Sequence, residues 1–307
     1  TYQLLNTREQ RLFCSLGIYT DMFSVKSVSD LLLIKDKHRW QVVDDLQRLL
    51  ALSLIQVSTQ VPETRFRLLE TMRQFACDKL RQQGEYTVLE ARFAGYYKVL
   101  VEEAQGDWFM LPTGQWRERY SHMLNDLRSV LQQTLTEGAD PSKGLKILQA
   151  MTPFWIEYSL YDECQRHIYP LLYENTSQVV LTLRQRMNLS AVAGKASTWA
   201  KGPTPETHSA WKTALTIAEK LDDKEIRLQA HYGLWLYYLR TGELDKALEH
   251  AQSMCELARS ITDEEAMATG LRILGVSLHF LGRHDVGRDY LQQSLDWYEH
   301  GELSHSF

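Results

Sequence analysis

Apolar residues recur every three or four positions in three stretches near the start of the chain. This period indicates amphipathic helices, because about 3.6 residues make one helical turn. A first helix is therefore predicted to begin at Thr7, because Thr7 and Gln10 have the spacing of a capping box. Two further helices are predicted over Val25–Ile34 and over Arg39–Leu52. The apolar face of the third helix is predicted to consist of Trp40, Val43, Leu46 and Leu50.

The period then changes to two. Apolar and polar residues alternate over Leu54–Val57 and again over Arg65–Leu68. The segment between them contains Pro62-Glu63-Thr64, which is typical of a turn, so a β-hairpin is predicted. Helical spacing returns from Glu70 to Gln83, where Gly84 ends the helix. The apolar positions of this helix are Met72, Phe75, Ala76 and Leu80. Three helices, a hairpin and a further helix are the element order of a winged-helix domain, which we predict over residues 1–83.

Only helical periodicity follows from Tyr86 onward. The pattern is interrupted by Gly138-Ala139-Asp140-Pro141, by Gly202-Pro203-Thr204-Pro205, and by single glycines at 242 and 282. The predicted helices span 86–105, 114–137, 142–160, 162–174, 178–199, 206–221, 224–241, 243–260, 264–281 and 283–299. We divide this part into a helical bridge over 84–177 and a sensor domain of repeats over 178–307.

An internal repeat supports this division. Leu221-Asp222-Asp223-Lys224-Glu225 reappears 40 residues later as Ile261-Thr262-Asp263-Glu264-Glu265, and the same offset relates Gly242 to Gly282. Each unit is a helix, a glycine turn and a second helix, as in tetratricopeptide repeats, although the period exceeds their ~34 residues. The predicted fold class is therefore mainly α: a winged-helix domain followed by an α-helical, tetratricopeptide-like superhelical repeat array.

Composition narrows the class of protein. The 44% hydrophobic and 24% charged residues are ordinary for a globular protein, and no run approaches the ~18 apolar residues of a membrane span. The four cysteines are isolated, which is typical of reduced thiols: Cys14, Cys77, Cys164 and Cys255. We expect a cytoplasmic protein without membrane contact. Because the chain begins at Thr1 and stops at Phe307 soon after a helix, we also expect it to be a portion of something longer.

Charge does not favour nucleic acid as a partner. The net charge is −5, and residues 1–80 hold eleven Lys and Arg against nine Asp and Glu. A winged helix that reads DNA needs a basic surface to meet phosphate. The helix over Arg39–Leu52 offers only Arg39 and Arg48 against Asp44 and Asp45. Direct DNA contact is therefore not expected, although it remains an alternative.

The sequence contains no recognisable catalytic constellation. It has no G-x-x-x-x-G-K-[ST] phosphate loop, no H-E-x-x-H motif and no G-x-S-x-G elbow. The pairs His279 and His284, and His300 and His305, are each five residues apart without a carboxylate in ligand register. We expect no enzyme activity, no metal site and no cofactor in this chain.

The segment Arg65–Ala76, with Ser53-Leu54-Ile55 upstream, resembles the winged-helix segment of bacterial STAND-class signal-transduction ATPases, many of which are transcription regulators. Similarity to later segments of this family is found in Arg92–Tyr97, Asn125–Arg128, Phe154-Trp155 and Gly233-Leu234-Trp235. The resemblance implies that the winged helix follows a nucleotide-binding domain and precedes a helical-repeat sensor. Related plant and animal proteins carry Met-His-Asp where this chain has Leu68-Leu69-Glu70, so their histidine contact with ADP is not implied here.

Two groups of candidate site residues follow. In tetratricopeptide stacks the first helix of each pair lines the concave face, which places Gln229 and Thr269 there together with six candidate effector-binding residues. These six are Tyr232, Leu236, Arg240, Arg272, Val276 and His279. Such a surface would suit an anionic or peptide-like effector, and the alternative is a solvated wall without a partner. Arg65, Arg67 and Arg73 are candidates for contact with a nucleotide or with the nucleotide-binding domain, and otherwise are solvated residues of the wing.

The resulting hypothesis is a regulatory and sensor portion of a STAND-type ATPase, a bacterial transcription regulator. The array would bind a small-molecule or peptide effector, or a protein. The winged helix would relay that binding to a nucleotide-binding domain of the parent chain. Two alternatives stay open: a passive protein-binding scaffold, and a winged helix that contacts DNA directly.

Overall fold

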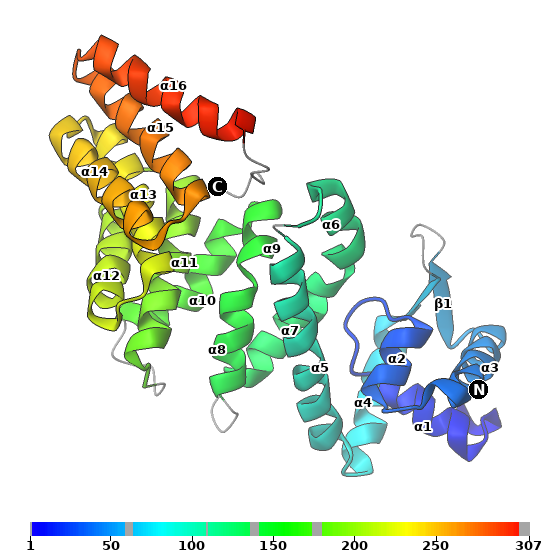
Figure 1. Ribbon diagram of the computed structural model, residues 1–307. Coiled ribbons are helices and arrows are strands. Elements are labelled where there is room, and N and C mark those ends of the chain that lie inside the picture. The colour runs from blue at the N-terminus through cyan, green and yellow to red at the C-terminus, as the bar shows by residue number, and fades with distance from the viewer. Residues whose placement is uncertain (1, 59–63, 109, 136–140, 174–179, 301–307) are drawn as a thin grey trace. The chain divides into compact units, whose positions relative to one another are not determined.

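The computed structural model describes residues 2–58, 64–108, 110–135, 141–173 and 180–300 (Figure 1). The fold is mainly helical, as predicted. The chain divides into two compact units, Thr1–Met151 and Thr152–Phe307. The finer division at residues 83 and 177 stays a prediction. No helix of the described residues combines the length and the apolar character needed to cross a membrane.

The first unit begins with helices, a hairpin and a further helix in the predicted order. The elements are α1 (Thr7–Leu16), α2 (Val25–Leu31), α3 (Arg39–Ala51), β1 (Ile55–Ser58), β2 (Arg65–Leu68) and α4 (Glu70–Gln82), with short 3-10 turns at Tyr2–Leu4 and Asp36–His38. β1 and β2 pair antiparallel, with Val57 opposite Phe66. Phe23, just before α2, forms an isolated bridge to Phe66 through two backbone hydrogen bonds of 2.8 Å. Of the predicted turn, Pro62 and Glu63 lie outside the described residues.

Two local predictions in this region are wrong. The capping box of α1 is formed by Asn6 and Glu9, one residue earlier than predicted, because Asn6 caps the helix. On α3 the buried apolar residues are Val42, Leu46 and Leu49, whereas Trp40 is 58% exposed and Val43 36% exposed.

The reason for the second error is Asp45, which shares the buried face of α3. Its carboxylate accepts hydrogen bonds from the Arg8 guanidinium at 2.6 and 2.9 Å. This pairing makes burial of the carboxylate possible, because a buried charge requires a partner. Because Asp45 is polar, the buried face of α3 does not show a continuous apolar pattern in the sequence.

α4 packs closely on the end of α1. A Cβ at Gly17 would lie 2.8 Å from the Cβ of Ala76 and 2.9 Å from the backbone nitrogen of Cys77, so only glycine allows this approach. The Cys77 thiol donates to the Gly17 carbonyl oxygen at 3.0 Å. On α4 the buried residues are Ala76, Cys77 and Leu80, and the predicted core residue Phe75 is 39% exposed. Gly84 follows this helix with φ +73°, as its predicted place requires.

The rest of the first unit is helical. It consists of α5 (Tyr86–Asp107), α6 (Thr113–Tyr120), a 3-10 turn at Ser121–Met123, α7 (Leu124–Thr134) and α8 (Pro141–Ala150). The helix predicted over 114–137 is thus interrupted at Ser121–Met123, and the one predicted over 142–160 is divided into α8 and α9 (Thr152–Glu157). Residues 138–140 of a predicted interruption lie outside the described chain.

A buried carboxylate joins the N-terminal helices to this helical part. Asp126 of α7 is fully buried and accepts hydrogen bonds from the Thr20 amide (2.6 Å), the Thr20 hydroxyl (2.7 Å) and the Tyr97 hydroxyl (2.6 Å). Thr20 follows α1, and Tyr97 lies on α5. Nearby, the rings of Tyr19 and Phe93 meet edge to face at 5.1 Å. A polar and an aromatic contact therefore connect residues that are distant in sequence.

The second unit consists of α9, α10 (Tyr161–Tyr173) and six longer helices. These are α11 (Leu183–Ala200), α12 (Pro205–Leu221), α13 (Lys224–Thr241), α14 (Leu244–Ile261), α15 (Glu264–Phe280) and α16 (His284–His300). Each packs on the next along the chain, so the six form three stacked pairs (Figure 1). Their bounds agree with the predicted segments to within a few residues, apart from residues 178 and 179, which are not described.

The 40-residue repeat has a physical counterpart in the turns. Gly202, Gly242 and Gly282 all have φ between +75° and +79°, and each ends the first helix of a pair. Between pairs, Asp223 and Asp263 each cap a first helix by accepting a backbone hydrogen bond, from Ile226 and Ala266 respectively. Helices α13 and α14 have 18 residues each, longer than those of a 34-residue repeat, which explains the longer period.

Small residues at Gly275 and Gly287 allow the two helices of the last pair to approach closely. A Cβ at Gly275 would lie 2.7 Å from the Gly287 carbonyl oxygen. In the preceding unit Trp235 occupies the position equivalent to Gly275, and its indole nitrogen donates to the Ser277 hydroxyl of α15 at 2.9 Å. The stacked pairs therefore form a tetratricopeptide-like helical fold with local differences in packing.

Candidate functional site

The first helices of the three pairs lie next to one another along one face of the second unit. Contacts between α11 and α13 and between α13 and α15 skip the intervening second helices. Arg240 of α13 contacts α11, and Tyr232 and Trp235 of α13 contact α15. We call this surface of α11, α13 and α15 the inner face of the array.

Arg240 lies in the last turn of α13 and reaches back to α11. Its Nη1 donates to the Thr198 carbonyl oxygen at 3.3 Å, and its Cζ lies 6.0 Å from the ring centroid of Trp199. Trp199 is 57% exposed, so this contact is at the surface. Among the described residues Arg240 has no carboxylate within ion-pair distance.

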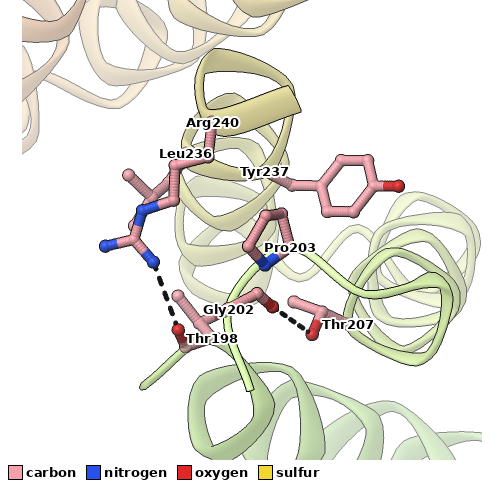
Figure 2. A pocket seen from close by; sticks show the side chains of 7 residues that line it. All are labelled: Thr198, Gly202, Pro203, Thr207, Leu236, Tyr237 and Arg240. Atoms are coloured by element: carbon pink, nitrogen blue, oxygen red, sulfur yellow. Dashed lines mark hydrogen bonds between the residues drawn. The ribbon is translucent and has the colours of Figure 1, made fainter. Parts of the chain in front are cut away.

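A shallow depression of about 150 Å³ lies beside Arg240 (Figure 2). It lies between the last turn of α13 and the loop that joins α11 to α12. Its lining residues are Thr198, Gly202, Pro203, Thr207, Leu236, Tyr237 and Arg240. The loop side is held by a hydrogen bond of 2.9 Å from the Thr207 hydroxyl to the Gly202 carbonyl oxygen (Figure 2). The depression thus has an apolar wall and one cationic group.

Arg272 forms a second cationic point on the inner face, one helix further along. Its Cζ lies 6.0 Å from the ring centroid of Tyr232 on α13. The Tyr232 ring in turn lies 5.4 Å from that of Trp235. No carboxylate pairs with Arg272 in the described part of the chain. Arg272 and Arg240 therefore share an arrangement in which a guanidinium rests near an aromatic ring.

The remaining predicted residues of this site contribute differently. Leu236 lines the depression, and Tyr232, Leu236 and Val276 are partly buried against the core of the last two pairs. Thr269, in contrast, is fully buried, so it cannot present its side chain on the surface. His279 is exposed at the end of α15, where its Nδ1 lies 3.2 Å from that of His284 on α16.

The three predicted wing residues each have contacts of their own. Arg67 donates to the Gln56 side chain at 3.2 Å, and Arg73 makes two hydrogen bonds of 2.8 Å to Glu70. Arg65, on the same face of β2 as Arg67, lies close enough to His122 to lower the pKa of that imidazole, whose burial is the larger cause of a pKa of about 3. The three guanidinium groups thus have separate surroundings.

The sequence reasoning missed four residues of this surface, because Thr198, Trp199, Pro203 and Tyr237 were not among the candidate site residues. A signal for Trp199 was present, because it stands at the end of a helix directly before the Gly202-Pro203 break, where a side chain is readily exposed. Among the described residues, no cluster of three or more potential metal ligands occurs.

Comparison with known proteins gives one sequence relationship. No family model matches the chain. Relatives from Mycobacterium bovis and Mycobacterium tuberculosis, provisionally named HTH-type transcriptional regulators, are 26% identical over 306 residues. The match covers 96% of this chain and 33% of each relative, so the chain spans about a third of their length. This is weak homology to a transcription regulator.

Solved structures add similarity of fold. BtubC (BKLC) from P. vanneervenii has a TM-score of 0.50 and 11% identity, over 78% of this chain and 91% of that one. A signal transduction ATPase with numerous domains (STAND) and a tetratricopeptide repeat sensor, from Pyrococcus horikoshii, has a TM-score of 0.46 and 14% identity. That match covers 97% of this chain and 45% of the other. At these identities the comparisons concern the fold alone.

Proposed function

We propose that this chain is the regulatory and sensor portion of a STAND-type ATPase that acts as a transcription regulator. The observation that carries the proposal is the match to HTH-type transcriptional regulators over 96% of the chain. The stacked helix pairs support a sensor role, since arrays of this kind offer an extended surface to a ligand. The array binds an effector or a protein, and the N-terminal elements relay this binding to a nucleotide-binding domain of the parent protein.

We infer that residues 1–83 form a winged-helix domain. The order α1, α2, α3, β1, β2, α4 supports this, and the bridge between Phe23 and Phe66 adds a further strand position to the hairpin. The hydrogen bonds from Thr20 and Tyr97 to Asp126 support the relay, because they attach the end of α1 to α5 and α7. A buried polar network whose groups are all satisfied makes the structure rigid and fixes its geometry.

Direct reading of DNA by this domain has less support. On α3, Arg39 is paired with Asp30 at 2.8 Å and with Asp36 at 3.0 Å. The same helix exposes Trp40 and Val43 and carries Asp44. Phosphate contact requires available Lys and Arg side chains, and this surface is mixed and partly apolar. A surface of this composition suits contact with protein better than contact with DNA.

A thermal-shift screen of the 307-residue chain against metabolites, nucleotides and short peptides tests ligand binding. A specific ligand at ~100 times its dissociation constant stabilises the folded state by about 2.7 kcal/mol, which is readily measured. The relay is tested in the full-length parent protein, where the same ligand is expected to change the rate of nucleotide release. A ligand that binds without changing that rate would favour the passive scaffold.

A further inference from the structure

We propose that His279 and His284 form a two-ligand site for a divalent transition metal of the zinc class, at the turn between α15 and α16. The two imidazoles bind the ion through their Nδ1 atoms, and water fills the remaining coordination positions. The bound ion links the last turn of α15 to the first turn of α16. The inference goes beyond the proposed function and does not depend on it.

The two Nδ1 atoms have the separation of two ligands of one metal ion. They lie 3.2 Å apart, and the two ring planes are tilted by 59° instead of being stacked. An ion at the usual Zn–N distance of about 2.0–2.1 Å from both nitrogens would make an N–Zn–N angle of about 100°. That angle lies between the ~90° of octahedral and the ~109° of tetrahedral coordination. The separation therefore fits a single ion held by both rings.

The chemistry of the pair selects a transition metal. Without an ion, one Nδ1–H donates to the other Nδ1, and binding moves that proton to Nε2, which neutral imidazole allows without a change of charge. Imidazole nitrogen suits Zn²⁺, Cu²⁺ and Ni²⁺, whereas Mg²⁺ and Ca²⁺ rely on carboxylates. Around this turn Arg283 and Arg288 outnumber Asp285. The charge of the turn therefore disfavours Mg²⁺ and Ca²⁺ in particular.

The turn between the two helices fixes the histidines relative to each other. In a continuous helix, residues five apart point about 140° away from each other. Here Gly282, with φ +79°, reverses the chain, and the Arg283 amide donates to the Leu278 carbonyl oxygen at 2.9 Å. A Cβ at Gly287 would lie 3.1 Å from the His279 backbone nitrogen, so α16 packs directly on the backbone that carries this ligand. Ligands on close-packed helices are oriented before binding, which lowers the cost of binding.

The 40-residue repeat indicates that packing does not require imidazoles at these two positions. The equivalent residues of the preceding pair are Leu239 and Leu244, on either side of Gly242. Leu239 is partly buried against the core of the array. In the last pair, two side chains that can bind metal thus replace two aliphatic ones. The leucines also show which substitutions this turn already accepts.

Another close histidine pair of the array, on α13 and α14, is less suited to an ion. His231 and His250 lie 3.0 Å apart through Nδ1, but His231 is only 7% exposed and Tyr238 stacks on the His250 ring. A two-ligand site needs space for coordinated water, because no third side-chain ligand joins either pair among the described residues. His279 and His284 are both exposed, so water can complete the coordination there.

Isothermal titration calorimetry with Zn²⁺ tests the site in the 307-residue chain, prepared without a histidine tag. We expect one ion per chain, and tighter binding of Cu²⁺ than of Zn²⁺, as is general for nitrogen ligands. Side-chain ¹⁵N NMR should show ligation at Nδ1 of two histidines. Ligation at Nε2 would overturn the inference. Half an ion per chain would also overturn it, because two molecules would then share the ion in place of water.

Variants identify the two ligands. H279L and H284L introduce the residues of the preceding pair, and each is expected to weaken Zn²⁺ binding at least ~10-fold. H279Q and H284Q keep the surface polar and should have the same effect, and circular dichroism verifies that every variant is folded. The matched controls are H250Q, from the buried pair, and H38Q, at an exposed position of the first unit; both should bind as wild type does. Unchanged binding by folded H279Q and H284Q, or an equal loss in H250Q, would contradict the proposed ligands.

Amide hydrogen exchange tests the link between the two helices. Zn²⁺ should slow exchange at the end of α15 and the start of α16 in wild type, because binding stabilises the closed form of this turn. The same addition should have no such effect in H284Q. Slowing confined to another part of the chain would place the ion elsewhere and overturn the inference. The regulatory role is tested separately by nucleotide release in the parent protein, so either proposal can fail without the other.

Discussion

Tyr97 donates a hydrogen bond of 2.6 Å to the carboxylate of Asp126, deep in the first unit. The same carboxylate accepts two hydrogen bonds from Thr20, so three donors converge on one fully buried group. Hydrogen bonds to a buried charged group stabilise a fold more than neutral ones do, because leaving the group unsatisfied is costly. The junction of α1, α5 and α7 therefore depends strongly on a few polar atoms.

Tyr97→Phe removes one of these donors and keeps the ring. We expect it to lower the free energy of unfolding by about 1.5–3 kcal/mol, measured by urea denaturation. Tyr169→Phe on α10 is the matched control, since Tyr169 is 43% exposed and its ring meets the Tyr173 ring in a tilted contact at 4.7 Å. A loss at Tyr97 no larger than that at Tyr169 would show that the hydroxyl does not stabilise the junction.

The protonation of Asp126 gives a prediction with a definite sign. Burial is the main cause that raises the pKa of this carboxyl to about 6, while the hydrogen bonds from Tyr97 and Thr20 oppose the rise. Because the folded pKa exceeds the unfolded one near 3.9, the folded state binds more protons between these values. The protonated Asp126 carboxyl group therefore contributes fully to stability below about pH 4, and this contribution is lost as the pH rises towards 6.

Comparison with Asp126→Asn isolates this effect from other titrating groups. We expect the difference in the free energy of unfolding, wild type minus variant, to fall by up to about 3 kcal/mol between pH 4 and pH 6.5. Urea denaturation at half-unit pH steps measures this difference. A difference that is constant with pH, or rises with it, would contradict the raised pKa of Asp126.

The array was predictable because its signals are local and repeated. Asp223 and Asp263 cap equivalent helices, and Gly242 and Gly282 end equivalent helices, so each feature is visible twice in the sequence. The buried face of α3 was not predictable from its own period, because Asp45 is buried only through Arg8, 37 residues away. The pairing of Arg240 with Thr198 and Trp199 similarly joins helices about 40 residues apart.

A pair of histidines makes the array sensitive to acid. His231 of α13 and His250 of α14 meet through their Nδ1 atoms at 3.0 Å, and the His250 ring stacks on that of Tyr238. Burial lowers the pKa of each to about 4, with further lowering of His231 by His250 and Arg227 and of His250 by His208. Two protonated imidazoles would repel each other at this distance.

Because these folded pKa values lie below the unfolded value near 6.5, the neutral pair stabilises the array above pH 6.5, and this contribution is lost as the pH falls towards 4. In wild type the free energy of unfolding of the array should therefore fall between pH 6.5 and pH 4, and we expect His250→Gln to reduce that fall by up to about 3 kcal/mol. Hydrogen exchange of the α13 and α14 amides at matched pH values, corrected for intrinsic rates, measures this free energy. His279→Gln, at an exposed position, is the control. An equal acid response in wild type and His250→Gln would exclude this role for the pair.

Close packing of the array can be tested at Gly233 of α13. A Cβ there would lie 2.2 Å from the Trp211 ring of α12, and the same ring confines Gly194 of α11 at 2.6 Å. Trp211 has little freedom to move away, because its indole nitrogen donates to the Thr198 hydroxyl at 3.1 Å. Gly233→Ala should therefore lower the free energy of unfolding by about 1–3 kcal/mol despite the higher helix propensity of alanine.

Gly95→Ala is the matched control, since Gly95 lies inside α5 and a Cβ there would meet no atom within 4 Å. It should raise the free energy of unfolding by about 0.5–1 kcal/mol, because alanine loses less backbone entropy in a helix. Urea denaturation of the two variants should thus give changes of opposite sign. If Gly233→Ala also stabilised the chain, Trp211 would have room to shift, and α11, α12 and α13 would be less tightly packed than these distances indicate.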